Sequence, residues 1–331
     1  MRKAVFALCA ALTLGSAALA QLRVDVALVE IVATVTDDRG RYVSGLTADD
    51  FILEEDGVPQ AIAHVTPSNN LPVSLGILLD VSSSMRRKMD TATAAIERFI
   101  RTIHEDDDIF LMTFADRSAI LQEFTNDRNK LGAAMRRIQL GPNTALYDAV
   151  DDGLLHIQRA IYKKRAILLV TDGEESGASA DTYNEALANV REDEVMLYCL
   201  GIAPSSTVDD FPRPSLRGPS LGPAPRGGPR GGFGSGFLPQ AQRRGAGSLD
   251  TVNMEVLRAF ADASGGQAWL VRDEGRDMDR IMDIIANELR NQYNIDYYPS
   301  RPLKDGKWHQ VEIRMKNPRH TVRARKDYFG G

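Results

Sequence analysis

The sequence of 331 residues is poor in cysteine and histidine, and this limits the kinds of site that it can build. Its two cysteines are Cys9 and Cys199. Cys9 lies in an N-terminal stretch that we expect to be removed, so no intrachain disulfide can form. Cys199 lies in an apolar run and is expected to be a buried, inert thiol. The five histidines are scattered. None belongs to an H-E-x-x-H motif or pairs with cysteine at zinc spacing, so no zinc site of those types is expected.

The N-terminus has an apolar stretch, but it is too short to span a bilayer comfortably. This stretch, Ala4 to Leu14, follows the basic start Met1-Arg2-Lys3 and precedes Ala18-Leu19-Ala20, an A-x-A cleavage signal. Residues 1–20 are therefore predicted to be a secretory signal peptide cut after Ala20, with an uncleaved anchor as the alternative. The mature chain is expected to have no transmembrane helix and to be secreted or periplasmic.

The chain also lacks an excess of positive charge. Its net charge is −5, and removal of the two basic residues in the signal peptide changes this to −7. An acidic protein outside the cytoplasm is a poor candidate for nucleic-acid binding, so no nucleic-acid partner is expected.

The most informative pattern is an apolar run that ends in a carboxylate followed by hydroxyls. The run Val73–Leu79 reads as a buried parallel strand, and Asp80, Ser82 and Ser84 follow it at alternate positions. In open α/β sheets, ligands bind at the carboxyl ends of the strands. Three oxygen side chains that converge there suit a hard cation such as Mg²⁺.

Two later segments supply further oxygen groups. The segment Gly141–Ala149 breaks one helix and opens another, and Thr144 occupies the expected N-cap position. The run Ala166–Val170 reads as a second buried strand, with Asp172 just beyond it and a Gly turn after that. Each segment alone is also consistent with an ordinary helix cap or turn.

Together these residues resemble a known family. The pattern D-x-S-x-S, then Thr in a G-x-x-T-A-L-Y-D-A context, then T-D-G, resembles the metal-ion-dependent adhesion site of von Willebrand factor type A domains, over about residues 71–290. The resemblance implies that Ser82, Ser84 and Thr144 touch the metal, that Asp80 and Asp172 act through bound waters, and that a partner carboxylate completes the coordination. Mg²⁺ is the expected ion, with Mn²⁺ and Ca²⁺ left open.

The fold class expected is α/β, with a doubly wound, mostly parallel sheet inserted in a small β-sandwich. Strands are expected at 73–79, 108–114, 166–171, 195–202 and 267–271, and helices at 92–103, 131–138, 146–161, 181–193, 253–263 and 277–290. Period-2 alternation at both ends predicts strands that are too few to be stable separately, so residues 21–70 and 291–331 are expected to pack together.

Residues 203–249 interrupt the α/β pattern of residues 71–290. They are rich in Pro, Gly and Arg, and we expect a disordered loop. The loop could touch an anionic envelope surface such as polysaccharide or lipid headgroups, or it could be an insertion without a role. The whole layout also resembles the bacterial secreted VWFA-related group, through Glu55-Asp56-Gly57 and the Tyr297-Tyr298-Pro299 segment.

The expected function is that of a binding module, not an enzyme. It would recognise a protein partner that offers Asp or Glu to a divalent cation. One alternative is a metal-dependent hydrolase of envelope polymers, for which Glu174 and Glu175 are the nearby candidate bases. Another is a structural envelope protein with a stabilising metal. A phosphatase of the haloacid-dehalogenase type is disfavoured, because it needs a second carboxyl where this chain has Ser82.

Overall fold

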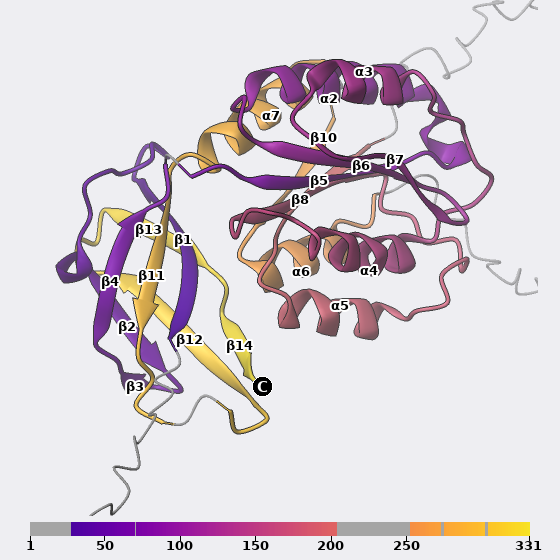
Figure 1. Cartoon of the computed structure of the whole chain (residues 1–331). Helices are drawn as coiled ribbons and strands as arrows, with labels where there is room; N and C mark the ends of the chain where they lie inside the picture. The colour runs from indigo at the N-terminus through magenta and orange to yellow at the C-terminus, as the bar shows by residue number, and fades with distance from the viewer. Residues whose placement is uncertain (1–27, 70, 204–251, 273–274, 302–303) are drawn as a thin grey trace, which may run out of the picture.

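A six-stranded sheet covered by helices on both faces forms the larger part of the computed structural model, and a β-sandwich lies at one end of it (Figure 1). The structure describes residues 28–69, 71–203, 252–272, 275–301 and 304–331. The expected signal peptide and residues 204–249 of the Pro/Gly/Arg-rich segment lie outside the described residues. No helix in the described ranges is long and apolar enough to cross a membrane.

The six-stranded sheet has the order β10-β9-β8-β5-β6-β7. Its strands are β5 (Ser74–Asp80), β6 (Asp108–Phe114), β7 (Ser118–Thr125), β8 (Arg165–Thr171), β9 (Met196–Ile202) and β10 (Gln267–Val271). All neighbours pair in parallel except β6 and β7, which are antiparallel. The near-continuous apolar runs of β5, β8 and β9 fit this arrangement, because strands buried on both faces have no polar side to alternate with.

Two sets of helices cover the sheet. One face carries α2 (Met89–Thr102), α3 (Arg128–Met135) and α7 (Arg276–Glu288), and the other carries α4 (Leu146–Ile157), α5 (Tyr183–Glu192) and α6 (Met254–Ser264) (Figure 1). Each helix buries an apolar stripe at helical spacing, such as Ala92, Ile96 and Phe99 on α2. The sequence therefore predicted the doubly wound fold class correctly.

The β-sandwich is built from both ends of the chain. One sheet has the order β13-β1-β11-β4 and the other β14-β12-β2-β3. The strands are β1 (Val29–Asp37), β2 (Phe51–Glu55), β3 (Val58–Pro59), β4 (Ile62–Pro67), β11 (Gln292–Tyr297), β12 (Lys307–Met315), β13 (His320–Ala324) and β14 (Asp327–Gly330). The N-terminal β1 pairs with β11 and β13, so the expected packing of the two ends is confirmed.

A buried polar cluster joins the sandwich to the larger domain. The Glu288 side chain, at the end of α7, accepts hydrogen bonds from Tyr198 Oη at 2.8 Å and Thr34 Oγ1 at 3.4 Å and pairs with Arg323. Glu288 is only 2% exposed. These partners come from β9, β1 and β13, so one carboxylate links both domains.

Some expected elements differ from the structure. The third helix ends at Ile157, and Ile161 lies beyond it with 76% of its surface exposed. The strands β7 and β14 were not predicted, because β7 has no regular alternation of apolar and polar residues and β14 has only four residues. Outside these strands, Tyr42 forms a single β-bridge with Thr36. Cys199 is fully buried, as expected, and its burial raises the pKa of the thiol.

Candidate metal centre

The predicted site residues lie at the carboxyl ends of β5 and β8, which are neighbours in the sheet. Asp80 ends β5, and Asp172 directly follows β8. From β5 the chain continues to β6 on one side, and the later strands β8 and β9 are added on the other side. The crevice between β5 and β8 is therefore the topological switch point of the sheet, where α/β proteins bind ligands.

Asp80 is fully buried and held by two hydrogen bonds. The Ser82 backbone N–H donates to Asp80 Oδ1 at 2.8 Å, and Thr171 Oγ1 donates to Oδ2 at 2.7 Å. Burial raises the pKa of Asp80 to about 6, although both hydrogen bonds act to lower it, and the negative charge of Asp172 adds to the increase. The two hydrogen bonds thus do not fully offset the cost of burying the charged carboxylate. A nearby cation would stabilise this charge.

The two serine hydroxyls meet in the loop that follows. Ser82 Oγ and Ser84 Oγ are 2.9 Å apart, with Ser82 buried and Ser84 half-buried. Ser82 has extended backbone angles and precedes the short 3-10 helix η2 (Ser83–Arg87), and the α-helix α2 then begins at Met89, before the expected start at residue 92. The structure therefore brings Asp80, Ser82 and Ser84 together at one point.

Thr144 is buried in the neighbouring loop, only 3% exposed. Its backbone N–H donates to Ser176 Oγ at 2.9 Å, and Ser176 Oγ donates back to the Thr144 carbonyl at 3.1 Å. Ser83 Oγ donates to the Pro142 carbonyl at 3.1 Å, which ties this loop to the serine loop. Thr144 therefore sits between the loops that carry the other four residues.

The expectation that Thr144 caps a helix was wrong. The N-cap of α4 is Ala145, whose side chain cannot accept a hydrogen bond. Glu175 takes this role, because its Oε2 accepts from the Leu146 N–H at 2.7 Å. The Thr144 hydroxyl therefore does not cap α4, and helix capping does not explain the presence of a threonine at this position.

Glu175 was considered above as a possible catalytic base. Besides the Leu146 N–H, it accepts from the backbone of Ala178 and Ser179, and Ser179 Oγ donates to Oε2 at 2.7 Å. Four donors therefore engage its two oxygens. A carboxylate held in this way orders a loop and a helix start, and its lone pairs are taken up by these contacts.

Asp172 has a partner that the sequence pattern did not predict. Lys88 Nζ lies 3.3 Å from Asp172 Oδ2 and also donates to the Ile202 carbonyl at 3.1 Å. The two side chains are 6% and 5% exposed, so this is a buried ion pair. In the run Arg86-Arg87-Lys88, only Lys88 is buried. The signal that could have found Lys88 is helical spacing, because it lies three residues after Met85 and four before Ala92, both buried.

Residues 75–175 match the family model for the von Willebrand factor type A domain. The chain carries a von Willebrand factor type A (VWA) domain. The matched range contains Asp80, Ser82, Ser84, Thr144 and Asp172, and runs from β5 to just beyond β8. VWA domains typically mediate protein–protein interaction or adhesion and are generally interaction modules rather than enzymes.

Several solved structures resemble the chain. BatB from Bacteroides thetaiotaomicron is 18% identical over 65% of this chain and 98% of its own, with a TM-score of 0.45. A von Willebrand factor type A protein from Catenulispora acidiphila is 14% identical over 87% of this chain and 73% of its own, with a TM-score of 0.46. Proximal thread matrix protein 1 from the mussel byssus, with a zinc-occupied MIDAS motif, is 13% identical to this chain. The match covers 70% of this chain and 48% of that protein, with a TM-score of 0.47. A comparison with curated proteins found no match.

The five residues predicted for the site would suit a hard divalent cation. They supply two carboxylates and three hydroxyls, all oxygen ligands of the kind that Mg²⁺ and Ca²⁺ prefer. Four of the five residues are less than 5% exposed, and Ser84 is half-buried at the surface. Ser84 is therefore the most exposed of the five residues.

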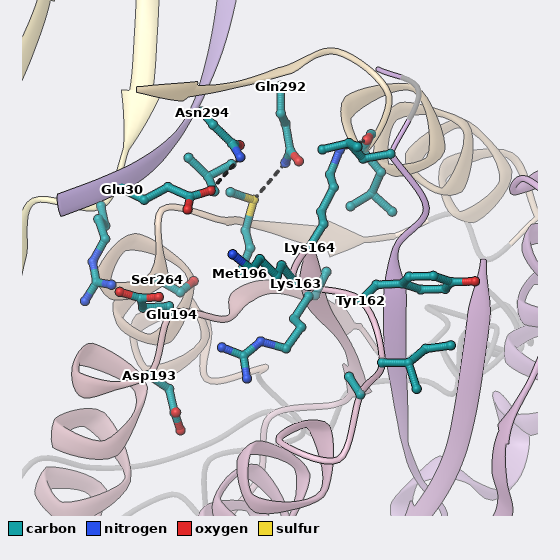
Figure 2. Close-up of a pocket in the computed structure, with 18 residues that line it drawn as sticks. Glu30, Tyr162, Lys163, Lys164, Asp193, Glu194, Met196, Ser264, Gln292 and Asn294 are labelled. Atoms are coloured by element: carbon teal, nitrogen blue, oxygen red, sulfur yellow. Dashed lines mark hydrogen bonds between the residues drawn. The ribbon is translucent and has the colours of Figure 1, made fainter. Parts of the chain in front are cut away.

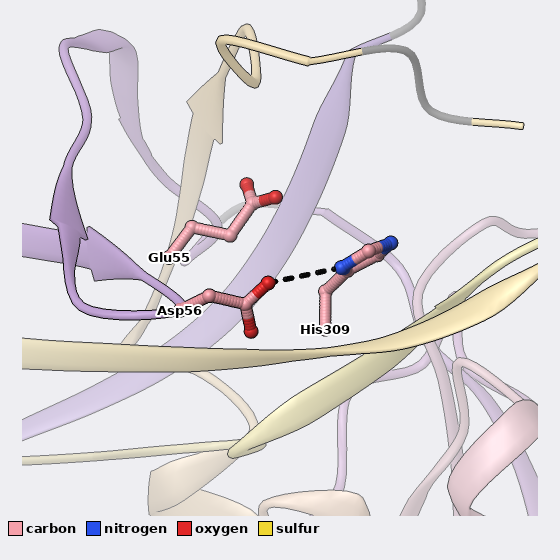
Figure 3. Close-up of side chains that lie close together, drawn as sticks. All are labelled: Glu55, Asp56 and His309. Carbon is pink, nitrogen blue, oxygen red and sulfur yellow. Dashed lines mark hydrogen bonds and ion pairs between the residues drawn. The ribbon is translucent and has the colours of Figure 1, made fainter. Parts of the chain in front are cut away.

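A second group of possible metal ligands lies in the β-sandwich. In the described part of the chain, Glu55, Asp56 and His309 have ligand atoms within 4.8 Å of one another, and Figure 3 shows Asp56 pointing toward His309. Arg301 Nε lies 2.8 Å from Glu55 Oε1, and its Nη2 contacts both carboxylates. Arg301 thus already compensates part of the negative charge of this cluster. Despite some burial, hydrogen bonds from Gln310, Arg301 and His309 lower the pKa of Asp56 to about 2.

A cavity of about 490 Å³ lies at the opposite end of the sheet, against the sandwich (Figure 2). Its charged lining residues include Glu30 and Glu194 as well as Lys163 and Lys164, so opposite charges face one another there. Lys164 Nζ is bound to the Ser68 carbonyl at 3.2 Å and hydroxyl at 3.1 Å and to the Leu289 carbonyl. Its burial, together with the charge of Arg290, lowers its pKa to about 7. The cavity is part of the domain junction and separate from the candidate metal centre.

Proposed function

We propose that this protein is a secreted or periplasmic binding module whose VWA domain recognises a carboxylate-bearing protein partner through a divalent cation. Asp80, Ser82, Ser84, Thr144 and Asp172 would hold the cation, and Mg²⁺ fits best, with Mn²⁺ and Ca²⁺ as alternatives. The observation that carries the proposal is the meeting of Asp80, Ser82 and Ser84 at the switch point of the sheet, where Asp172 arrives from the next strand.

The roles of the residues follow from their positions. A bound divalent ion would supply an electrophilic position that an incoming carboxylate can occupy. Ser82, Ser84 and Thr144 offer neutral oxygens, which leave the charge of an ion largely uncompensated. Asp80 is fixed by Ser82 and Thr171, so its carboxylate is already oriented. The sandwich joins the opposite end of the sheet, away from this edge (Figure 1).

The contacts of Glu175 support binding over hydrolysis. Both of its oxygens accept hydrogen bonds from the backbone, and this matches the role of a helix cap. A general base must instead present a lone pair to a substrate or a water molecule.

The proposal predicts metal-dependent capture of a partner. The protein without residues 1–20 would be immobilised and exposed to an envelope extract in Mg²⁺ and in EDTA, beside an Asp80→Ala/Ser82→Ala variant. We expect proteins retained by the wild type in Mg²⁺ to be lost, by about tenfold or more, in EDTA and on the variant. An Asp106→Ala variant, whose altered side chain is 68% exposed, serves as the control and should retain them.

Retention that is unchanged by both EDTA and the double substitution would contradict the proposal. Recognition would then occur through another surface of the chain, such as the sandwich. Melting curves of each variant, recorded beside the retention assay, separate loss of the site from loss of the fold.

A further inference from the structure

The buried ion pair of Lys88 with Asp172 places a positive charge inside the proposed metal centre. Lys88 Nζ is 3.3 Å from Asp172 Oδ2, one of the five proposed ligands, and 3.1 Å from the Ile202 carbonyl. The lysine as a whole is 5% exposed and Asp172 is 4% exposed. A buried ion pair is weakly screened by solvent or salt, so its charges act strongly on anything bound next to them.

Lys88 is held in this position by its place in the chain. It joins η2 to α2, and its backbone carbonyl accepts from the Ala92 N–H at 2.9 Å. Its side chain points from this helix start toward the ends of β8 and β9, where Asp172 and Ile202 lie. The neighbouring Arg86 and Arg87 are exposed, so of these three basic residues only Lys88 enters the site.

The positive charge of Lys88 changes how strongly the site is expected to attract a divalent cation. Asp80 and Asp172 alone would give two negative charges, a strong attraction for a divalent cation. With the Lys88 ammonium the net charge of the three side chains is one negative charge. Coulomb attraction for a cation is therefore weaker, and Asp172 is compensated even when no metal is bound.

We propose that Lys88 acts as a resident counter-cation that stabilises the metal-free site and lowers its affinity for divalent ions. This inference rests on the proposed metal-binding function and adds its regulation: the ion is held firmly only when a partner carboxylate joins the site. Metal and partner would then bind cooperatively, since each supplies a charge that the other needs.

The test compares Mg²⁺ and Mn²⁺ affinity of the wild type, Lys88→Met and Arg86→Met by calorimetric titration. Arg86→Met removes the same charge from the same turn, but at an exposed position. We expect Lys88→Met to bind at least about tenfold more tightly than the wild type, and Arg86→Met to differ by less than about twofold. Metal-free Lys88→Met should melt at a lower temperature, and Mg²⁺ should raise that temperature more than in the wild type.

Each outcome has a separate meaning. Equal affinities in wild type and Lys88→Met would overturn the inference and leave the proposed metal site intact. Absence of binding by all three proteins would overturn both. If Lys88→Met does not fold, Lys88→Gln replaces it in the titration, because glutamine keeps a donor for the Ile202 carbonyl. This variant should also bind the metal more tightly than the wild type.

Discussion

Replacement of Asp172 by alanine should destabilise the metal-free protein by about 3 kcal/mol or more, because it leaves the Lys88 ammonium buried without its carboxylate. The two side chains are 3.3 Å apart and almost fully buried, so solvent cannot replace the lost partner without rearrangement. Chemical denaturation of the wild type and the Asp172→Ala variant in EDTA measures this loss. Asp106→Ala, at an exposed position, should change stability by less than about 0.5 kcal/mol.

A double substitution separates this ion pair from other causes. Asp172→Ala combined with Lys88→Met removes both charges, and we expect it to recover most of the stability lost by Asp172→Ala alone. If Asp172→Ala is as stable as the wild type in EDTA, the ion pair contributes nothing and the account of Lys88 is wrong. A stabilising metal, the structural alternative, predicts instead that EDTA itself lowers the stability of the wild type.

Replacement of Glu288 by alanine should have the second large effect, a loss of about 3–5 kcal/mol. Glu288 is 2% exposed and binds Arg323, Tyr198 and Thr34, which belong to three different strands. The change leaves the Arg323 guanidinium without its carboxylate and removes one of the polar links between the two domains. Denaturation curves give the magnitude, and hydrogen exchange in β1 and β11 should become faster.

The matched control for Glu288 is Glu192→Ala, at the exposed end of α5. This variant should lose less than about 0.5 kcal/mol. Glu288→Gln keeps an acceptor for Tyr198 but removes the charge, so it should lie between the wild type and Glu288→Ala. Unchanged exchange in β1 and β11 of Glu288→Ala would show that other contacts, and not this cluster, hold the domains together.

The parts of the fold that the sequence predicts well are those set by local pattern. The apolar run Leu75–Leu79 with Asp80 at its end identifies both a buried strand and the edge where ligands bind. The stripe on α2 follows the helical period. The pairing of β1 with β11 could be inferred because neither end of the chain had enough strands to be stable alone.

What the sequence could not predict depends on contacts between distant residues. Glu175 caps α4 although it lies 29 positions after Leu146 in the sequence. The residues near Leu146 therefore do not indicate that the Thr144 hydroxyl is not the helix cap. Lys88 meets Asp172 across 84 positions, and a lysine among arginines reads as solvent-exposed until the burial of Met85 and Ala92 is known. Glu288 becomes a link only when β9, β1 and β13 are assembled around it.

The most direct test of the central claim is calorimetric titration of the protein without residues 1–20 with Mg²⁺ and Mn²⁺, with and without acetate as a carboxylate mimic. The account predicts saturable binding at one site in the wild type, tightened by acetate, and none in Asp80→Ala/Ser82→Ala. The same titration curve in wild type and variant, or no binding by the wild type even with acetate, would contradict it.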